Sequence, residues 1–432
     1  MDDYIIKNKL SGRKVTGEII VPQRHRKYIK STKFFAYYDT DIYADPSIIN
    51  IPLLATILPL AWITGSDVHL NVIDRRFKES MDHLQQDFKK TYSLGPFTTK
   101  IKAKKLTDNK ISLIDTEAKT ALLFSGGVDS TYSMVKNLEH KPRLLMIWGV
   151  DNFPYPENKS QWDLIFSTYS EQANRLKLPI NLIQTNITQI LDEKRINHAF
   201  HKVLYNGSFR FLFQHSLILL PLMAPISIGR FNKLLIASST GPSRDFTKLP
   251  WGSNPSIDEQ MVWADLTVRH DGVIERVEKI TSIKPFLDKY NLLLKVCLKK
   301  LDRPELNDGN CEKCIRTMIT LILSGIDPNT CGFKVDSSTF MIMKEILSGQ
   351  VDKRYLVHLA PIQKTIPPGF EFDLSGSKEF YEWFRNYQFK PLGNITKFYK
   401  TYYNLPYPVA RFFNYIYRKL GIPIHDPTPL LS

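Results

Sequence analysis

Residues 120–130 read TALLFSGGVDS, and the predicted fold depends on this stretch more than on any other. The apolar run Thr120–Phe124 predicts a buried strand, and a helix is expected to begin near Asp129. A glycine-rich turn between a strand and a helix is typical of a phosphate site, because its backbone N–H groups and the helix N-terminus face an anion. Ser125 and Ser130 add hydroxyl donors. No Gly-Lys-Ser/Thr follows the turn, so it is not a Walker A loop.

The pattern of short apolar runs alternating with longer helical stretches continues beyond this turn. The predicted strands are 120–124, 144–150, 180–185 and 234–238. Such alternation predicts an α/β fold with a doubly wound, mostly parallel sheet. We expect three parts: an α+β N-terminal domain over residues 1–115, an ATP-binding domain over 116–332 and a helical C-terminal region over 333–432. The lysine-rich segment 99–115 is interpreted as the connection between the first two.

The other strand ends should lie at the same edge of the sheet as the turn, where doubly wound sheets bind ligands. The candidates are Gly149, Asp151, Ser239, Thr240 and Gly241. Asp151 could equally be a helix cap, and residues 238–241 could form a plain turn.

A second group of polar and aromatic residues follows in the sequence. Residues 244–255 predict a substrate-covering loop, and its candidate binding residues are Asp245, Trp251, Gly252 and Asn254. Arg276 and Lys279 could stabilise negative charge on phosphate oxygens, with Lys279 as a catalytic candidate beside Asp129 and Ser130. The alternative for both cations is a solvated place on a helix surface.

All four cysteines of the chain fall within one stretch of 35 residues: Cys297, Cys311, Cys314 and Cys331. The spacing Cys-x-x-Cys at 311–314 lets two thiolates bind one tetrahedral Zn²⁺, and structural zinc sites normally have four ligands. The alternative is a set of small buried apolar side chains. Four cysteines do not make a disulfide scaffold for a chain of 432 residues.

The turn resembles the SGGxDS signature of the PP-loop (N-type) ATP pyrophosphatase superfamily. The resemblance implies an adenine nucleotide alpha hydrolase-like sheet, binding of ATP and Mg²⁺, and release of AMP and pyrophosphate. It implies that the nucleotide phosphates contact Ser125, Gly126, Gly127, Asp129 and Ser130.

Residues 310–317, NCEKCIRT, are similar to the zinc-binding end of 7-cyano-7-deazaguanine synthase and of its uncharacterised relatives. Those proteins carry an upstream cysteine and then a Cys-x-x-Cys-x-x-Cys run. Here Asp308 replaces the first cysteine of that run, so a zinc site would need Asp308 or Cys331 as its fourth ligand. The resemblance covers residues 121–332 and implies a divergent relative with another substrate.

Composition adds weaker indications. A net charge of +15 fits a polyanionic partner such as tRNA, and the basic, aromatic region 390–425 predicts contact with nucleic acid or an anionic membrane surface, unless its aromatic residues pack on the protein. Apolar runs at 51–63 and 217–228 contain proline and are shorter than a membrane span, so they predict buried helices. With no secretory pattern at the N-terminus, we expect a cytoplasmic protein.

The sequence therefore predicts an ATP-dependent ligase or synthase that activates a small-molecule carboxylate or carbonyl by adenylation, before a nitrogen or sulfur nucleophile displaces AMP. Two alternatives remain open: an RNA-modifying enzyme such as a tRNA thiolase or a lysidine-type ligase, and a non-catalytic nucleotide-binding protein.

Overall fold

A computed structural model of the chain describes most of its 432 residues. The described residues are 2–92, 95–114, 118–150, 153–202, 204, 208–242, 251–297, 299, 305–351, 353–391 and 404–412.

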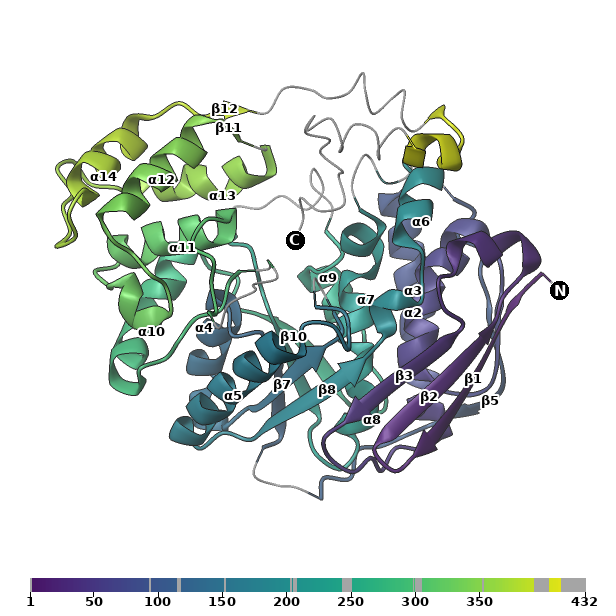
Figure 1. Ribbon diagram of the computed structural model, residues 1–432. Coiled ribbons are helices and arrows are strands. Elements are labelled where there is room, and N and C mark those ends of the chain that lie inside the picture. Colours follow the sequence, from purple (N-terminus) through teal and green to yellow (C-terminus); the bar gives the residue numbers. More distant parts are fainter. Residues whose placement is uncertain are drawn as a thin grey trace.

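One sheet of ten strands forms the centre of the protein, in the order β10-β9-β6-β7-β8-β3-β2-β1-β4-β5 (Figure 1). Its strands are β1 (Tyr4–Ser11), β2 (Lys14–Ile20), β3 (Lys33–Tyr38), β4 (Val68–Asp74), β5 (Ile101–Thr107), β6 (Thr120–Leu123), β7 (Arg143–Trp148), β8 (Ile180–Thr185), β9 (Lys233–Ala237) and β10 (Thr267–Asp271). Strands β10 to β8 pair in parallel, as do β1, β4 and β5, whereas β8, β3, β2 and β1 pair antiparallel. The predicted α/β class with a mostly parallel sheet is confirmed.

The chain reverses its direction of travel across the sheet beside β6. After β6 it adds β7 and β8 on one side, and β9 and β10 lie on the other side of β6. Ala121 of β6 pairs with Arg143 of β7 and with Leu234 of β9. In open parallel sheets, the carboxyl end of the strand at such a reversal borders a crevice between two helix layers. The turn at 125–130 lies at this place.

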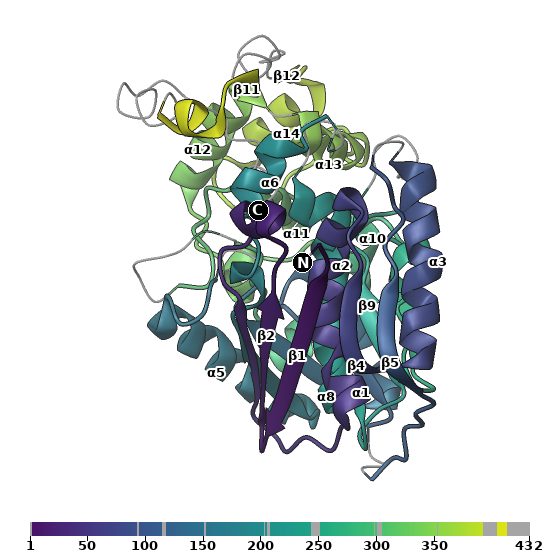
Figure 2. The same ribbon diagram turned by 90° about the vertical axis from the view of Figure 1, so that its right-hand side faces the viewer.

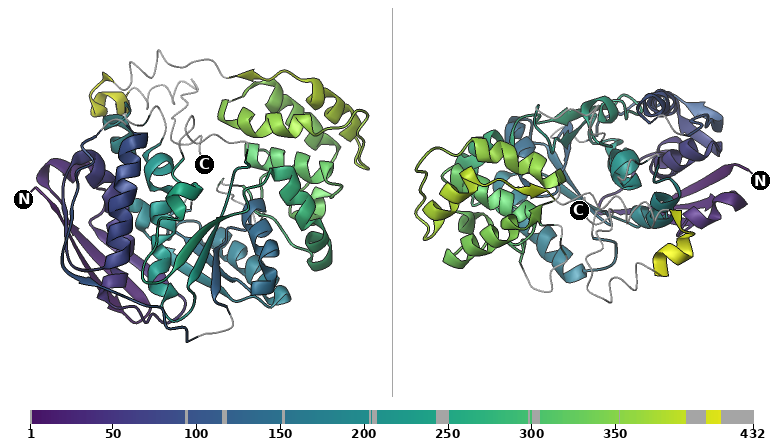
Figure 3. Two further views of the ribbon diagram at one scale, coloured as in Figure 1. Left: turned by 180° about the vertical axis from the view of Figure 1, so that it is seen from behind. Right: turned by 90° about the horizontal axis from the view of Figure 1, so that it is seen from above.

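Helices cover both faces of the parallel part of the sheet (Figures 1 and 3). They are α1 (Pro46–Ile49), α2 (Ile51–Thr64), α3 (Arg75–Thr91), α4 (Val128–Lys136), α5 (Lys159–Leu176), α6 (Glu193–Ala199), α7 (His215–Leu219), α8 (Ala224–Ser227), α9 (Pro255–Asp258), α10 (Arg276–Tyr290), α11 (Glu312–Leu323), α12 (Ser337–Ser348), α13 (Lys353–Lys364) and α14 (Ser377–Asn386). Short 3-10 or π turns occupy Gln23–Tyr28, Leu138–His140, Ile187–Gln189, Arg210–Gln214, Pro221–Met223 and Pro328–Cys331. Two apolar cores result, one with α2, α3, α7 and α8 and the other with α4, α5, α10 and α11.

Helix α2 lies at the centre of the first core. The joined segment Pro46–Thr64 is long and apolar enough to cross a bilayer by length and composition, yet 94% of its apolar window is buried inside the protein. Buried core helices also have this length and apolar composition, and the burial of α2 agrees with the predicted buried helix.

The N-terminal strands do not form a separate sheet. Strand β3 pairs with β8, so β1–β5 continue the sheet that holds the phosphate turn (Figure 2), and the first apolar core also extends across the expected boundary near residue 115. The segment 99–115 is not simply a connection, because β5 within it is the edge strand beside β4. Lysine suits an exposed edge, since its charge opposes pairing with another chain.

Beyond residue 333 the described chain is mainly helical, as expected, with one two-stranded pair, β11 (Gln350–Val351) and β12 (Lys390–Pro391). Tyr381 of α14 donates a 2.8 Å hydrogen bond to the carbonyl of Ile319 in α11 and is fully buried. This helical part therefore packs against the second core. Of the predicted basic and aromatic tail, residues 392–403 and 413–432 lie outside the described residues. Tyr407 contacts His198 and Arg195 of α6.

Candidate phosphate loop and metal cluster

The turn after β6 is held in one conformation by its neighbours. Gly126 has φ of +75°, and a Cβ there would lie 2.0 Å from the Tyr169 ring. The Gly126 carbonyl accepts hydrogen bonds from the Tyr169 hydroxyl at 3.1 Å and from the Lys295 backbone N–H at 2.8 Å. Only glycine combines this φ with this space. The turn is therefore rigid before any ligand binds.

The start of α4 directly follows this turn. Gly127 is its N-cap residue, and no side chain caps the helix. Buried Ser130 donates from Oγ to the Gly127 carbonyl at 3.2 Å and accepts from the Ser125 N–H at 3.3 Å, whereas Ser125 itself is exposed. Ser130 thus braces the turn from inside. The uncapped N-terminus of α4 leaves a partial positive charge beside exposed Ser125, which suits an anion.

Two cations converge on the Asp129 carboxylate. Lys279 Nζ lies 2.8 Å from Asp129 Oδ1, and Arg276 lies 3.7 Å from Oδ2. The Lys279 side chain is only 2% exposed and that of Arg276 only 15%, so neither is a solvated helix charge. Burial alone would raise the pKa of Asp129, but Lys279 and Arg276 outweigh it and hold that pKa below its ordinary value.

Lys279 also joins two strand ends. Besides Asp129, its Nζ donates to the Ser238 carbonyl at 2.5 Å, directly after β9. Ser238 is buried, and its Oγ donates to the Thr240 carbonyl at 2.8 Å, while Ser239 is exposed. Gly241 lies against Glu275, because a Cβ there would be 2.3 Å from the Glu275 carboxylate. The turns after β6 and β9 are therefore neighbours, as predicted.

Arg316 of α11 is a third cation beside Lys279 and Arg276. Arg276 donates to Thr317 Oγ1 of α11 at 2.7 Å, and Arg316 lies 3.3 Å from the Glu312 carboxylate. The Nε atom of Arg276 is buried and makes no hydrogen bond, whereas Nε of Arg316 is the atom that faces Glu312. Burial, with repulsion from Arg316, lowers the pKa of Arg276 to about 10. Three mostly buried cations around two carboxylates, with the unsatisfied Nε–H group of Arg276, make this place electropositive and suited to an anion.

The turn after β7 is close to β8. Gly149 has φ of +121°, and a Cβ there would meet the Thr185 carbonyl at 1.8 Å. Thr188 donates to the Gly149 carbonyl at 2.8 Å. Glycine is needed here for backbone packing between adjacent strand ends. The predicted nucleotide contact Asp151 lies outside the described residues.

The expected substrate-covering loop is only partly described, because Asp245 lies outside the described residues. Trp251 stacks on Phe211 with ring centroids 5.3 Å apart. Gly252 donates from its N–H to the Phe211 carbonyl at 2.7 Å, and the Asn254 side chain caps α9 by accepting from the Ile257 N–H. These three residues anchor the chain by packing and capping, so their contacts are structural.

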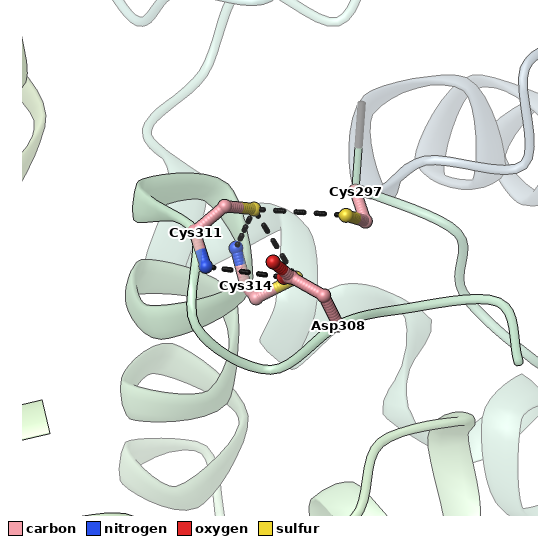
Figure 4. A group of neighbouring side chains, drawn as sticks. All are labelled: Cys297, Asp308, Cys311 and Cys314. Carbon is pink, nitrogen blue, oxygen red and sulfur yellow. Dashed lines mark hydrogen bonds between the residues drawn. The ribbon is translucent and has the colours of Figure 1, made fainter. Parts of the chain in front are cut away.

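The metal cluster is built around the start of α11 (Figure 4). Ligand atoms of Cys297, Asp308, Cys311 and Cys314 all lie within 4.8 Å of one another. Cys311 Sγ is 3.3 Å from Cys314 Sγ and 3.9 Å from Cys297 Sγ, and Cys314 Sγ is 3.2 Å from Asp308 Oδ1. Cys311 is the N-cap residue of α11, so the helix itself sets the Cys-x-x-Cys geometry. Three thiols and one carboxylate could bind a metal such as zinc.

The pKa values of the thiols in this cluster favour a bound cation. Hydrogen bonds from Cys311 and Cys314 hold the pKa of Cys297 below its ordinary value, and hydrogen bonds with Cys297 and Cys311 raise the pKa of Cys314. Ionisation of the Cys297 thiol therefore opposes ionisation of the Cys314 thiol. Lys299 contacts the Asp308 carboxylate at 2.6 Å. A divalent cation would allow all the thiols to ionise.

Cys331 is not a member of this group. It is 1% exposed in the second apolar core, next to Thr330, and burial raises the pKa of its thiol. The alternative of a small buried apolar side chain therefore describes Cys331, and Asp308 takes the place beside the three other cysteines.

Several residues of the site had no signal in the sequence. Tyr169 and Lys295 secure Gly126, and Thr317 holds Arg276 from α11. Each lies at least 41 residues from its partner, so only the fold brings them together. Comparison of the chain with models of protein families, with curated proteins and with solved structures gives no match.

Proposed function

We propose that the chain binds ATP with its β and γ phosphates on the turn 125–130 and adenylates an oxygen of a small-molecule acceptor. The observation that carries this proposal is the convergence of Lys279 and Arg276 on Asp129, beside a rigid glycine turn at the strand where the sheet order reverses. Doubly wound sheets bind nucleotides at such a reversal. We assign the fold to the adenine nucleotide alpha hydrolase-like type and the turn to the PP-loop superfamily on this basis.

In the proposed reaction, a carboxylate or carbonyl oxygen of the acceptor attacks the α phosphorus. A P–O bond to the acceptor forms, the bond to the bridging oxygen breaks, and pyrophosphate leaves. Negative charge then grows on the leaving phosphates, where Lys279, Arg276 and the α4 N-terminus supply fixed positive charge. A nitrogen or sulfur nucleophile subsequently displaces AMP from the adenylate.

Divalent cations have distinct places in this proposal. Mg²⁺ is usually held by one or two carboxylates together with the substrate phosphates, and Asp129 is the carboxylate at the turn. Asp129 would then share its oxygens with Lys279, Arg276 and the ion. Zn²⁺ suits the other set, Cys297, Asp308, Cys311 and Cys314, and with four protein ligands its role would be structural.

Pyrophosphate should compete with ATP for the turn. We expect ATP binding, followed by fluorescence of a labelled analogue with Mg²⁺, to be displaced by pyrophosphate and by ATP but weakly by AMP. Gly126→Ala should weaken binding at least tenfold, because its Cβ meets Tyr169 and its φ is unfavourable. Gly369→Ala is the control, since Gly369 also has positive φ but open space around it. Displacement by AMP alone, or equal effects of both variants, would contradict the assignment.

The two alternatives make different predictions. An RNA-modifying enzyme requires an RNA acceptor, so AMP formation would depend on added tRNA. A non-catalytic nucleotide-binding protein would bind ATP and pyrophosphate without turnover in any metabolite extract.

A further inference from the structure

The face of the sheet that α5 covers over β7 and β8 continues without a covering helix among the described residues over β3, β2, β1, β4 and β5. Residues along β1, β2 and β3 alternate between buried and outward positions, and α1, α2 and α3 pack against the buried side. Figures 2 and 3 show these strands on one side and α2 and α3 on the other. The uncovered side is called the open face.

The open face is strongly basic. Its outward lysines are Lys7 and Lys9 on β1, Lys14 on β2, Lys33 on β3, and Lys102 and Lys104 on β5. Among the outward positions of these five strands, as far as the structure describes them, the one acidic side chain is Glu18. It pairs with Lys33. Asp3 and Asp67 lie at the rim, next to Lys102. Lys9 and Lys104 make no ion pair within the described part of the chain, so their charge is available to a ligand.

Aromatic rings lie among these charges. Tyr37 is opposite Lys14 in the β2–β3 register and is 38% exposed. Phe35 is half-buried two residues away on the same face, and Lys14 Nζ lies 5.3 Å from its ring centroid. A sheet surface can bind single-stranded nucleic acid when its lysines contact the phosphate groups and an aromatic ring stacks on a base.

We propose that the open face binds single-stranded RNA. Charge complementarity selects a polyanion, and the exposed Tyr37 ring selects unstacked bases over a duplex, whose bases are already stacked. An anionic membrane fits less well, because the outward apolar residues Ile5 and Ile20 are only partly exposed and lie at one end of the face. The inference does not depend on the proposed adenylation and would survive its failure.

Binding is tested with a fluorescein-labelled oligouridine of about 15 nucleotides and fluorescence anisotropy from about 50 to 200 mM salt. The test variant replaces Lys9, Lys14 and Lys104 by glutamine. We expect at least a tenfold loss of affinity, and a slope of log K against log salt that is smaller by about 2, since each phosphate contact contributes about 0.7 on a single strand. Tyr37→Ala should weaken binding about tenfold with an unchanged salt slope.

The matched control removes the same charge elsewhere, by replacing the exposed Lys289, Lys344 and Lys364 on α10, α12 and α13 with glutamine. It should retain binding within about twofold. Equal losses in the two triple variants, no effect of Tyr37→Ala, or binding to phosphatidylserine vesicles but not to oligouridine would each overturn the proposal. All substituted side chains are exposed or half-buried, and unchanged thermal unfolding shows that each variant folds.

Discussion

Lys279→Met should lower formation of AMP and pyrophosphate by about 100-fold to 1000-fold, because it removes a buried cation from the place where negative charge develops on the phosphates. The same substitution should cost about 3 kcal/mol of stability, since Asp129 loses its nearest partner. Activity is measured per folded protein, after the thermal unfolding midpoint of the variant is known.

The pH dependence of stability separates this ion pair from a general packing defect. In the wild type the pKa of Asp129 is lowered, so its pair stabilises the fold above the ordinary carboxyl pKa and that contribution is lost as pH falls through the lowered value. In Lys279→Met, burial should dominate and raise the pKa of Asp129. Its ionised form then costs stability at neutral pH, and the cost disappears as pH falls.

The gap in unfolding midpoint between wild type and Lys279→Met should therefore narrow from pH 7 to pH 4. Lys159→Met is the control, because Lys159 forms an exposed pair with Asp163 on α5, and such pairs contribute little. A gap that stays constant with pH, or an equal loss in the control, would show that Asp129 and Lys279 do not form a buried pair.

Cys314→Ser should abolish binding of one zinc ion per chain and lower the thermal unfolding midpoint by roughly 5 to 10 °C. The cause is the loss of one of four ligands at the first turn of α11, which also carries Arg316 and Thr317. Zinc content is measured after purification in zinc-containing buffer, and stability by thermal unfolding with and without a chelator.

Cys331→Ser provides the matched control for the cluster. It removes a buried cysteine of the same stretch that lies outside the four-ligand group, so zinc content should remain at one per chain. Asp308→Cys should retain zinc, because a fourth thiolate suits the same tetrahedral site. Loss of zinc in Cys331→Ser, with retention in Cys314→Ser, would refute the ligand set.

Local sequence patterns predicted much of the architecture. The apolar runs around β6, β7, β8 and β9 were recognisable, because burial on both sheet faces requires continuous apolar residues. The pairing of β3 with β8, which joins the N-terminal strands to the parallel part of the sheet, was not recognisable. The antiparallel pair Ala36 and Thr185 is separated by almost 150 residues and has no local signal. Strand β5 was missed because its lysines resemble a solvated connection.

The candidate site likewise contains residues that the local sequence indicated and contacts that only the fold creates. The turn 125–130 was evident from its glycines, but the choice between Asp308 and Cys331 depended on distances that spacing does not give. The sequence also left Lys279 undecided between a cation that stabilises phosphate oxygens and a solvated charge on a helix surface. Its contact with Asp129, 150 residues away, exists only in the folded protein.

The central claim is cleavage of ATP between the α and β phosphates. The most direct measurement incubates the protein with Mg²⁺ and ATP labelled at the α and γ positions, together with a metabolite extract, and separates AMP, ADP, pyrophosphate and phosphate. Our account predicts AMP and pyrophosphate in equal amounts, with loss of both in Ser130→Ala, whose hydroxyl braces the turn. ADP and phosphate as the products, or ATP that is bound but never cleaved, would contradict it.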